Sequence, residues 1–260
     1  MFELICEVEP ATKPDLREVR HQIGVMSRLA TGFLIPDNHI GRATVSSIAV
    51  AHEVELMGGR AVACINARDR NTLGFRRDLL TAAAYGVREF LFVYGDRPES
   101  GARSDDLTVR VMLDEARSFS TRHADAEFRV GVTTRLAPVP SWKLKADTLF
   151  VQVVHEIDDL AAWRDTIAYD GPVYAGVMVF ATAAMARKLS SDVPQLAAPP
   201  STIEALERDP TAGIKLAVDT VLALRETPGF AGAHLIPVRK YREVAASLER
   251  ALSRTPLDQT

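Results

Sequence analysis

Two glutamates near the start of the chain are placed where they could do acid–base chemistry. Glu7 and Glu9 alternate with a cysteine and a valine, so both lie on one face if the segment is extended. A carboxyl group among apolar side chains tends to stay protonated, because desolvation disfavours its charged form. Such a group can act as a general acid near neutral pH. The alternative is that one or both glutamates form a salt bridge with Arg17 or Arg135.

Further polar residues close other short apolar runs of the sequence. They are Asp37, Asn38, Asn66, Asp96, Thr133, Thr134, Arg135, Gln152 and Arg239. This set is rich in acids and amides, which favours hydrogen bonding and proton transfer. Asp96 follows a glycine, where an aspartate often only caps a turn. Gln152 has apolar neighbours, and a buried amide there serves either a ligand or a structural hydrogen bond.

Several kinds of site have no counterpart in the sequence. No lysine ends an apolar run, which argues against a Schiff-base aldolase. No histidine–carboxylate pair stands at such an end, and the two cysteines are not spaced as zinc ligands, so we expect no metal. His155 and His234 have no partner in the sequence that would give them a role. No Gly-x-Gly-x-x-Gly segment supports a Rossmann dinucleotide site.

The elements that must position these side chains are short apolar runs alternating with helical patterns. The runs resemble parallel strands covered on both faces, and we expect strands at 4–9, 32–37, 61–67, 89–96, 128–134, 148–154, 172–179 and 233–238. Helices are expected at 15–29, 44–57, 73–86, 107–120, 158–168, 181–192, 211–226 and 240–253. This order predicts an α/β protein, a single (βα)8 TIM barrel over residues 1–260. A doubly wound open sheet is the competing architecture.

The active sites of such barrels lie at the carboxyl ends of the strands and in the loops that follow them. We expect two long loops there, at 95–106 and at the proline-rich 194–210. The Arg-Asp-Arg segment 68–70 is expected to be a solvated loop.

Composition limits the classes of protein to which the chain can belong. Its 260 residues are close to the roughly 250 that are typical of a one-domain barrel. The net charge of −3 gives no reason to expect nucleic acid or an anionic membrane as partner. No long apolar run and no signal peptide occur, so we expect a cytoplasmic protein. The sequence leaves open whether it forms a homo-oligomer.

Longer segments resemble the methylenetetrahydrofolate reductase family along nearly the whole chain. EVEPATKPDL (7–16) is similar to the family's opening Glu-x-x-Pro-Pro strand. INARDRNTLGFRRDLLTAAAYGVREFLFVYGDRP (65–98) is similar to its central stretch, which ends in Gly-Asp-x-Pro. FVQVV (150–154) matches the strand that carries the family's glutamine, and VYAGVMVF (173–180) matches a later strand more loosely.

The resemblance implies an enzyme that reduces 5,10-methylenetetrahydrofolate to 5-methyltetrahydrofolate with NADH or NADPH. Glu7 then corresponds to the acid that helps to protonate the pterin, and Glu9 replaces it if the register differs by two. Asp96 corresponds to the aspartate that hydrogen-bonds the pterin and steadies the cation formed there. Gln152 corresponds to the glutamine that contacts the folate, with Asn66 as a further expected substrate contact.

The residues expected around the cofactor are Asp37, Asn38, Tyr94, Thr133 and Arg135. Three positions at which relatives contact the flavin depart from the family pattern. Family members that hold FAD typically carry a histidine where this chain has Cys64, an arginine where it has Tyr94, and a tyrosine where it has Arg135. These replacements argue against tight FAD binding. They favour the family's flavin-independent branch, in which nicotinamide hydride passes directly to the methylene carbon.

Three alternatives stay open on the sequence. The first is an FAD-dependent reductase of the same family. The second is a pterin-dependent methyltransferase, which would need a zinc or corrinoid partner. The third is a folate-binding barrel that keeps the fold but has lost the chemistry.

Overall fold

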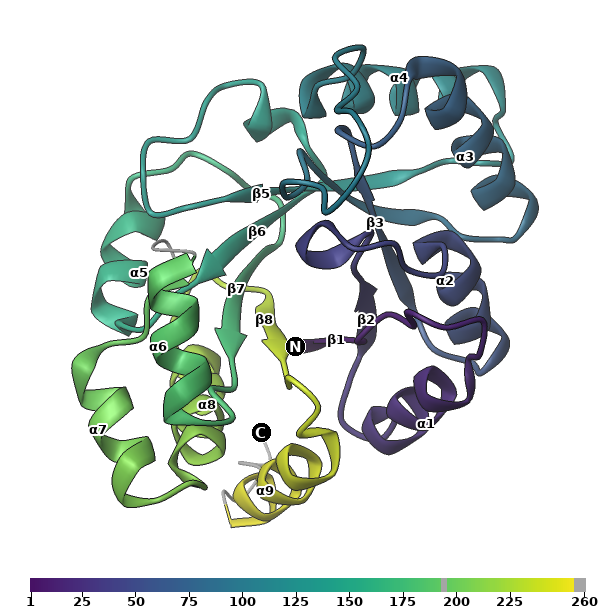
Figure 1. Ribbon diagram of the computed structural model, residues 1–260. Coiled ribbons are helices and arrows are strands. Elements are labelled where there is room, and N and C mark those ends of the chain that lie inside the picture. Colours follow the sequence, from purple (N-terminus) through teal and green to yellow (C-terminus); the bar gives the residue numbers. More distant parts are fainter. Residues whose placement is uncertain (193–195, 255–260) are drawn as a thin grey trace.

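A closed barrel of parallel strands forms the centre of the molecule (Figure 1). The computed structural model describes residues 1–192 and 196–254, and the statements below concern that part of the chain. Its strands, in order around the barrel, are β1 (Glu3–Glu7), β2 (Gly32–Ile35), β3 (Ala61–Asn66), β4 (Glu89–Val93), β5 (Arg129–Thr134), β6 (Thr148–Val153), β7 (Val173–Met178) and β8 (Gly232–Ile236). Pairing of β1 with β8 closes the ring, which excludes the open sheet.

Helices surround the barrel on its outside (Figure 1). They are α1 (Arg17–Met26), α2 (Ser47–Leu56), α3 (Thr72–Ala84), α4 (Val109–Arg122), α5 (Ile157–Asp165), α6 (Ala183–Asp192), α7 (Pro200–Arg208), α8 (Ala212–Glu226) and α9 (Tyr241–Arg254). Two short 3-10 helices, η1 (His39–Gly41) and η2 (Lys143–Lys145), lie in loops. None of the helices in the described part is long and apolar enough to span a membrane.

Alternation along the strands builds two separate cores. One set of side chains packs inside the barrel, namely Ile5, Leu34, Val62, Leu91, Phe150 and Tyr174. Their neighbours along each strand point outward and pack against the helices, as Cys6 and Phe33 do. Because both faces of each strand are buried, the runs read as continuously apolar in the sequence.

The strands occur where the sequence predicts them, but several end earlier. Glu9, Asp37 and Asp96 lie in loops rather than in strands. Pro36 has no backbone N–H to continue the ladder after β2. After β1, the N–H of Glu9 donates to the side chains of Gln22 and Tyr241 and not to β2. The early ends move these carboxylates out of the strands and into the loops at the carboxyl end of the barrel, which we call the mouth.

The prediction of an extended loop at 194–210 is wrong for most of its length. Residues 194 and 195 lie outside the described residues, but 200–208 form helix α7. Pro200 occupies the first turn of this helix, where a missing N–H costs nothing because that group has no partner within the helix. Leu206 anchors α7 in a small apolar cluster with Phe180 and Ala186. The predicted loop at 95–106 is confirmed, since it carries no helix or strand.

Candidate active site at the mouth of the barrel

Glu7 lies inside the mouth, as the last residue of β1. Its side chain is only 15% exposed, and its Oε2 atom lies 3.3 Å from Nε2 of His234. Among the described residues no arginine or lysine forms an ion pair with it. A carboxylate held by a guanidinium is fixed in its charged form. Glu7 has no such partner among the described residues, so its carboxyl group is available to a ligand.

Glu9 is placed quite differently, outside the barrel. Its carboxylate accepts hydrogen bonds from the largely exposed Arg239, with an Nη2–Oε1 distance of 3.0 Å. Its backbone N–H donates to Gln22 and to the hydroxyl of Tyr241. The salt-bridge interpretation therefore applies to Glu9, with Arg239 as the partner in place of Arg17, which pairs with Asp15. The structure separates two glutamates that the sequence could not distinguish.

Asp37 and Asn66 belong to a buried network of paired groups. The Asn66 amide donates to Asp37 Oδ2 at 2.8 Å and to Asp69 Oδ2 at 3.0 Å. Arg70 Nη1 lies 2.7 Å from Asp37 Oδ2. Asn38 also donates to Asp69. Three residues expected at the substrate or cofactor thus have side chains already engaged with the protein.

The prediction that 68–70 form a solvated loop is wrong for the two arginines, although Asp69 between them is exposed. Arg68 is 2% exposed, and Arg70 is held between the carboxylates of Asp37 and Asp78. Burial alone would raise the pKa of Asp69, but hydrogen bonds from Asn38, Arg68 and Asn66 hold it below its usual value. The carboxylates neutralise the arginines, which lets this charged segment pack at the edge of the barrel.

Tyr94 and Asp96 lie on the exposed loop that follows β4. The guanidinium of Arg103 packs over the ring of Tyr94, with its Cζ atom 5.6 Å from the ring centroid. Asp96 Oδ2 accepts a hydrogen bond from the backbone N–H of Ile40, which has the positive φ of 51° that β-branched residues rarely adopt. Asp96 therefore ties the 95–106 loop to the η1 turn on the neighbouring side of the mouth.

Gln152 stands on a β-bulge at the end of β6. Val151 pairs with Ala175 while Val153 pairs with Gly176, so Gln152 is the extra residue between them. A Cβ at Gly176 would lie 2.9 Å from the backbone of β6, so glycine is needed beside the bulge. Bulges re-aim side chains and recur near active sites. The expectation of a buried amide is wrong, because Gln152 is exposed. Its side chain has no hydrogen-bond partner in the described chain.

Two cations stand near the end of β5. Arg135 is exposed and forms no ion pair with any described carboxylate. Lys143, in η2, donates from Nζ to the carbonyl of Thr133 at 2.7 Å. Burial, together with the nearby Arg135, lowers the pKa of Lys143. No sequence pattern predicts a role for Lys143, because it lies in a loop before β6 and does not end an apolar run.

Cys64 is a buried free cysteine in β3. Burial, and then the carboxylate of Asp37, raise the pKa of the Cys64 thiol, so it is neutral and a poor ligand. No group of three or more histidine, cysteine or acidic side chains with the arrangement of a metal site occurs in residues 1–192 and 196–254.

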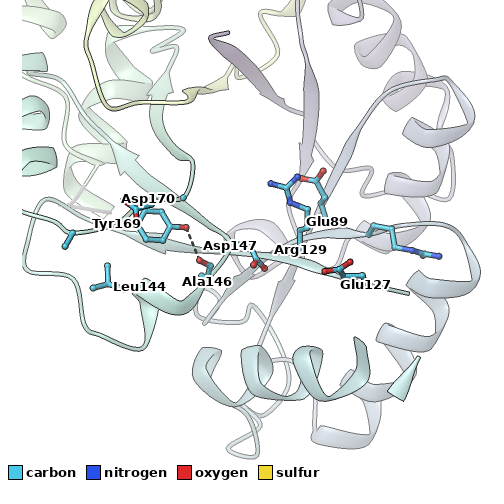
Figure 2. Close-up of a pocket in the computed structure, with 11 residues that line it drawn as sticks. Glu89, Glu127, Arg129, Leu144, Ala146, Asp147, Tyr169 and Asp170 are labelled. Atoms are coloured by element: carbon cyan, nitrogen blue, oxygen red, sulfur yellow. Dashed lines mark hydrogen bonds between the residues drawn. The ribbon is translucent and has the colours of Figure 1, made fainter. Parts of the chain in front are cut away.

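A cavity of about 740 Å³ lies at the opposite, amino-terminal end of the strands (Figure 2). Glu89 and Arg129, the first residues of β4 and β5, contribute to its wall. The Tyr169 hydroxyl is bound there to the carbonyl of Ala146. In TIM barrels this end usually serves stability, whereas chemistry occurs at the carboxyl end. We therefore place the candidate site at the mouth and not in this cavity at the amino end.

The fold is shared with solved barrels of distant sequence. A protein from Clostridium thermocellum, described as binding two copies of 5-methyl-5,6,7,8-tetrahydrofolic acid, is 10% identical, with a TM-score of 0.62 over 96% of this chain and 95% of that one. The tryptophan synthase α-subunit of Pyrococcus furiosus is 14% identical, with a TM-score of 0.57 over 97% and 100%. Phosphoribosylanthranilate isomerase from the same organism is 9% identical, with a TM-score of 0.51 over 98% and 100%. No protein-family model matches the sequence, and no curated protein matches it. At these identities the likeness establishes the fold, and the chain is a TIM barrel.

Proposed function

We propose that the mouth of this barrel binds a reduced folate and reduces 5,10-methylenetetrahydrofolate to the 5-methyl form with NADH or NADPH. The observation that carries the proposal is the placement of Glu7, a carboxyl group inside the mouth without an arginine or lysine partner in the described chain. The segments that resemble methylenetetrahydrofolate reductases include this residue. The Clostridium thermocellum barrel, described as binding 5-methyltetrahydrofolic acid, supports a folate ligand for this fold.

In this proposal Glu7, Asp96 and Gln152 each have a separate role in the reaction. Glu7 supplies a proton to the pterin, which opens the bridging methylene to an iminium cation. The negative charge of the Asp96 carboxylate stabilises the developing positive charge, and the Gln152 amide orients the pterin by hydrogen bonds. Hydride transfer then needs the nicotinamide and methylene carbons within about 3–3.5 Å of each other.

The side chains at the expected flavin positions favour direct hydride transfer without FAD. Cys64 carries a buried neutral thiol, and Tyr94 packs against Arg103 on an exposed loop. Neither offers the hydrogen bonds that the histidine and arginine of FAD-binding relatives would supply. We therefore propose NADH or NADPH as the co-substrate and no bound flavin.

An anaerobic assay of NADH and NADPH oxidation with methylenetetrahydrofolate, without added flavin, tests the proposal. The protein's UV–visible spectrum is recorded beforehand. Turnover by a colourless protein is the expected result. A yellow protein that bleaches with NADH would show that FAD is bound, and the FAD-dependent mechanism would then replace direct hydride transfer. Absence of turnover with either nicotinamide, with or without FAD, would overturn the reductase proposal.

The second candidate function is a folate-binding barrel without chemistry. The engaged side chains of Asp37, Asn38 and Asn66 favour it, because they leave fewer free groups around the cofactor than the sequence suggested. Titration of the wild-type protein with 5-methyltetrahydrofolate, followed by its absorbance or by calorimetry, separates the two. Binding without turnover would establish this second function.

A further inference from the structure

His234 lies one layer deeper in the barrel than Glu7, in the middle of β8. It is level with Ile5 of β1 and Gly176 of β7. Its side chain is 11% exposed, and its ring meets that of Phe150 edge to face, with centroids 5.9 Å apart. The imidazole is therefore held inside the barrel, beneath the carboxyl group of Glu7.

The Nε2 atom of His234 is close to Glu7 but is not satisfied by it. It lies 3.3 Å from Glu7 Oε2, yet the geometry does not form a hydrogen bond, and Nε2 has no other partner in the described chain. Buried polar atoms are nearly always hydrogen-bonded, so an exception calls for an explanation. A small rotation of the Glu7 carboxyl would align the pair, and hydrogen bonds of catalytic groups often tighten only when substrate binds.

Resting on the proposed function, we infer that His234 is the positioning residue for Glu7. When the carboxyl group turns toward the pterin, Nε2–H of His234 donates to Oε2 and fixes the side chain. Oε1 then carries the proton that passes to the pterin nitrogen, and the carboxylate that remains keeps the hydrogen bond from Nε2. His234 touches neither substrate nor cofactor in this arrangement.

Two amide substitutions test the inference because they differ mainly in reach. His234→Gln can place an N–H near the position of Nε2, whereas His234→Asn cannot. His52→Asn is the matched control, since His52 stacks on Tyr85 in the outer ring of helices. For each variant we would measure kcat, KM for methylenetetrahydrofolate and the thermal unfolding midpoint.

The expected result is a split between kcat and KM. His234→Asn should lower kcat about 10- to 100-fold with KM changed less than about threefold, and His234→Gln should recover most of the loss. Adding His234→Asn to Glu7→Gln should cost nothing more, because both act through one group. His52→Asn should leave kcat unchanged.

Other outcomes overturn the inference in distinguishable ways. Normal kcat in folded His234→Asn, or losses that multiply in the double variant, would overturn the role of His234 and leave the proposed function standing. A parallel fall in kcat and unfolding midpoint for both His234 variants would assign it a structural role. Absence of turnover in the wild-type protein would overturn the proposed function and this inference together.

Discussion

The polar side chains that point into the barrel are paired differently at its two ends. At the amino end, Arg60 Nη2 lies 2.8 Å from Glu3 Oε2, and Arg60 Nε lies 3.7 Å from Glu89 Oε1. The Tyr174 hydroxyl donates a hydrogen bond to Glu3 Oε2 at 2.6 Å. At the mouth, Glu7 has one poorly aligned neighbour, His234, and Gln152 has no partner in the described chain. Groups that satisfy one another stabilise a fold, whereas groups left without partners are available to a ligand.

The amino end shows how pairing shifts ionisation, although Nε of Arg60 itself has no hydrogen-bond partner in the described chain. Burial and the bond to Glu3 raise the pKa of Tyr174 to about 12. Burial opposes ionisation of Glu3, but hydrogen bonds from Tyr174 and Arg60 hold its pKa below the usual value. The cavity next to this network has a charged wall that includes Glu89 and Arg129 (Figure 2). We therefore assign stability to the amino end and chemistry to the mouth.

The largest expected effect is the loss of turnover on removing the acid at the mouth. Glu7→Gln should lower kcat by about 10²- to 10⁴-fold, because an amide cannot donate the proton. The unfolding midpoint should stay within a few degrees, since no ion pair with arginine or lysine is broken. Glu9→Gln should have a much smaller effect on kcat. The reverse order of the two variants would move the acid to Glu9 and show that the buried position is not decisive.

The next effect tests the buried network beside the mouth. Asp37→Ala should reduce the free energy of unfolding by about 1–3 kcal/mol, because Arg70 and the Asn66 amide lose one acidic partner and keep only Asp78 and Asp69. Glu99→Ala, which breaks an exposed pair with Arg42, should cost about 0–1 kcal/mol and is the matched control. Urea denaturation measures both. A stable Asp37→Ala protein with weakened nicotinamide binding would instead return Asp37 to the cofactor role that the sequence suggested.

A smaller effect is expected from the unpartnered amide. Gln152→Ala should weaken folate binding about tenfold, equivalent to about 1.4 kcal/mol, with unfolding unchanged because no protein hydrogen bond is lost. Titration with 5-methyltetrahydrofolate measures the affinity. Unchanged affinity would remove Gln152 from the site.

The smallest effect concerns pH and the amino end. Because the pKa of Glu3 is lowered by folding, its contribution is present above its unfolded value of 4.5 and is lost as the pH falls through its folded value. Glu3→Gln should therefore be less stable than the wild type at pH 7, by about 1 kcal/mol. The difference should shrink below pH 4. An equal difference at pH 7 and pH 3 would show that Glu3 acts through packing and not through its charge.

The barrel could be predicted from the sequence, because the apolar runs that mark its strands are local patterns. Each strand is buried on both faces and leaves an apolar run, as AVACIN does in β3. The sequence does not predict helix α7, because Pro199 and Pro200 suggest a linker, although a proline in the first helical turn is compatible with a helix.

The candidate site could be predicted only in part, because its geometry depends on contacts between distant segments. Glu7 and Gln152 were expected from their positions, but the bulge at Gln152 depends on its pairing with β7. His234 lies 227 residues from Glu7 along the chain, and only closure of the barrel brings the two together. The pairing of Glu9 with Arg239 has the same origin.

The most direct test of the division between the two ends is to measure Glu7→Gln and Glu3→Gln side by side, for kcat and for the free energy of unfolding. We predict that Glu7→Gln loses turnover and keeps its stability, while Glu3→Gln loses stability and keeps its turnover. Turnover retained in Glu7→Gln, or lost in folded Glu3→Gln, would contradict the assignment of chemistry to the mouth.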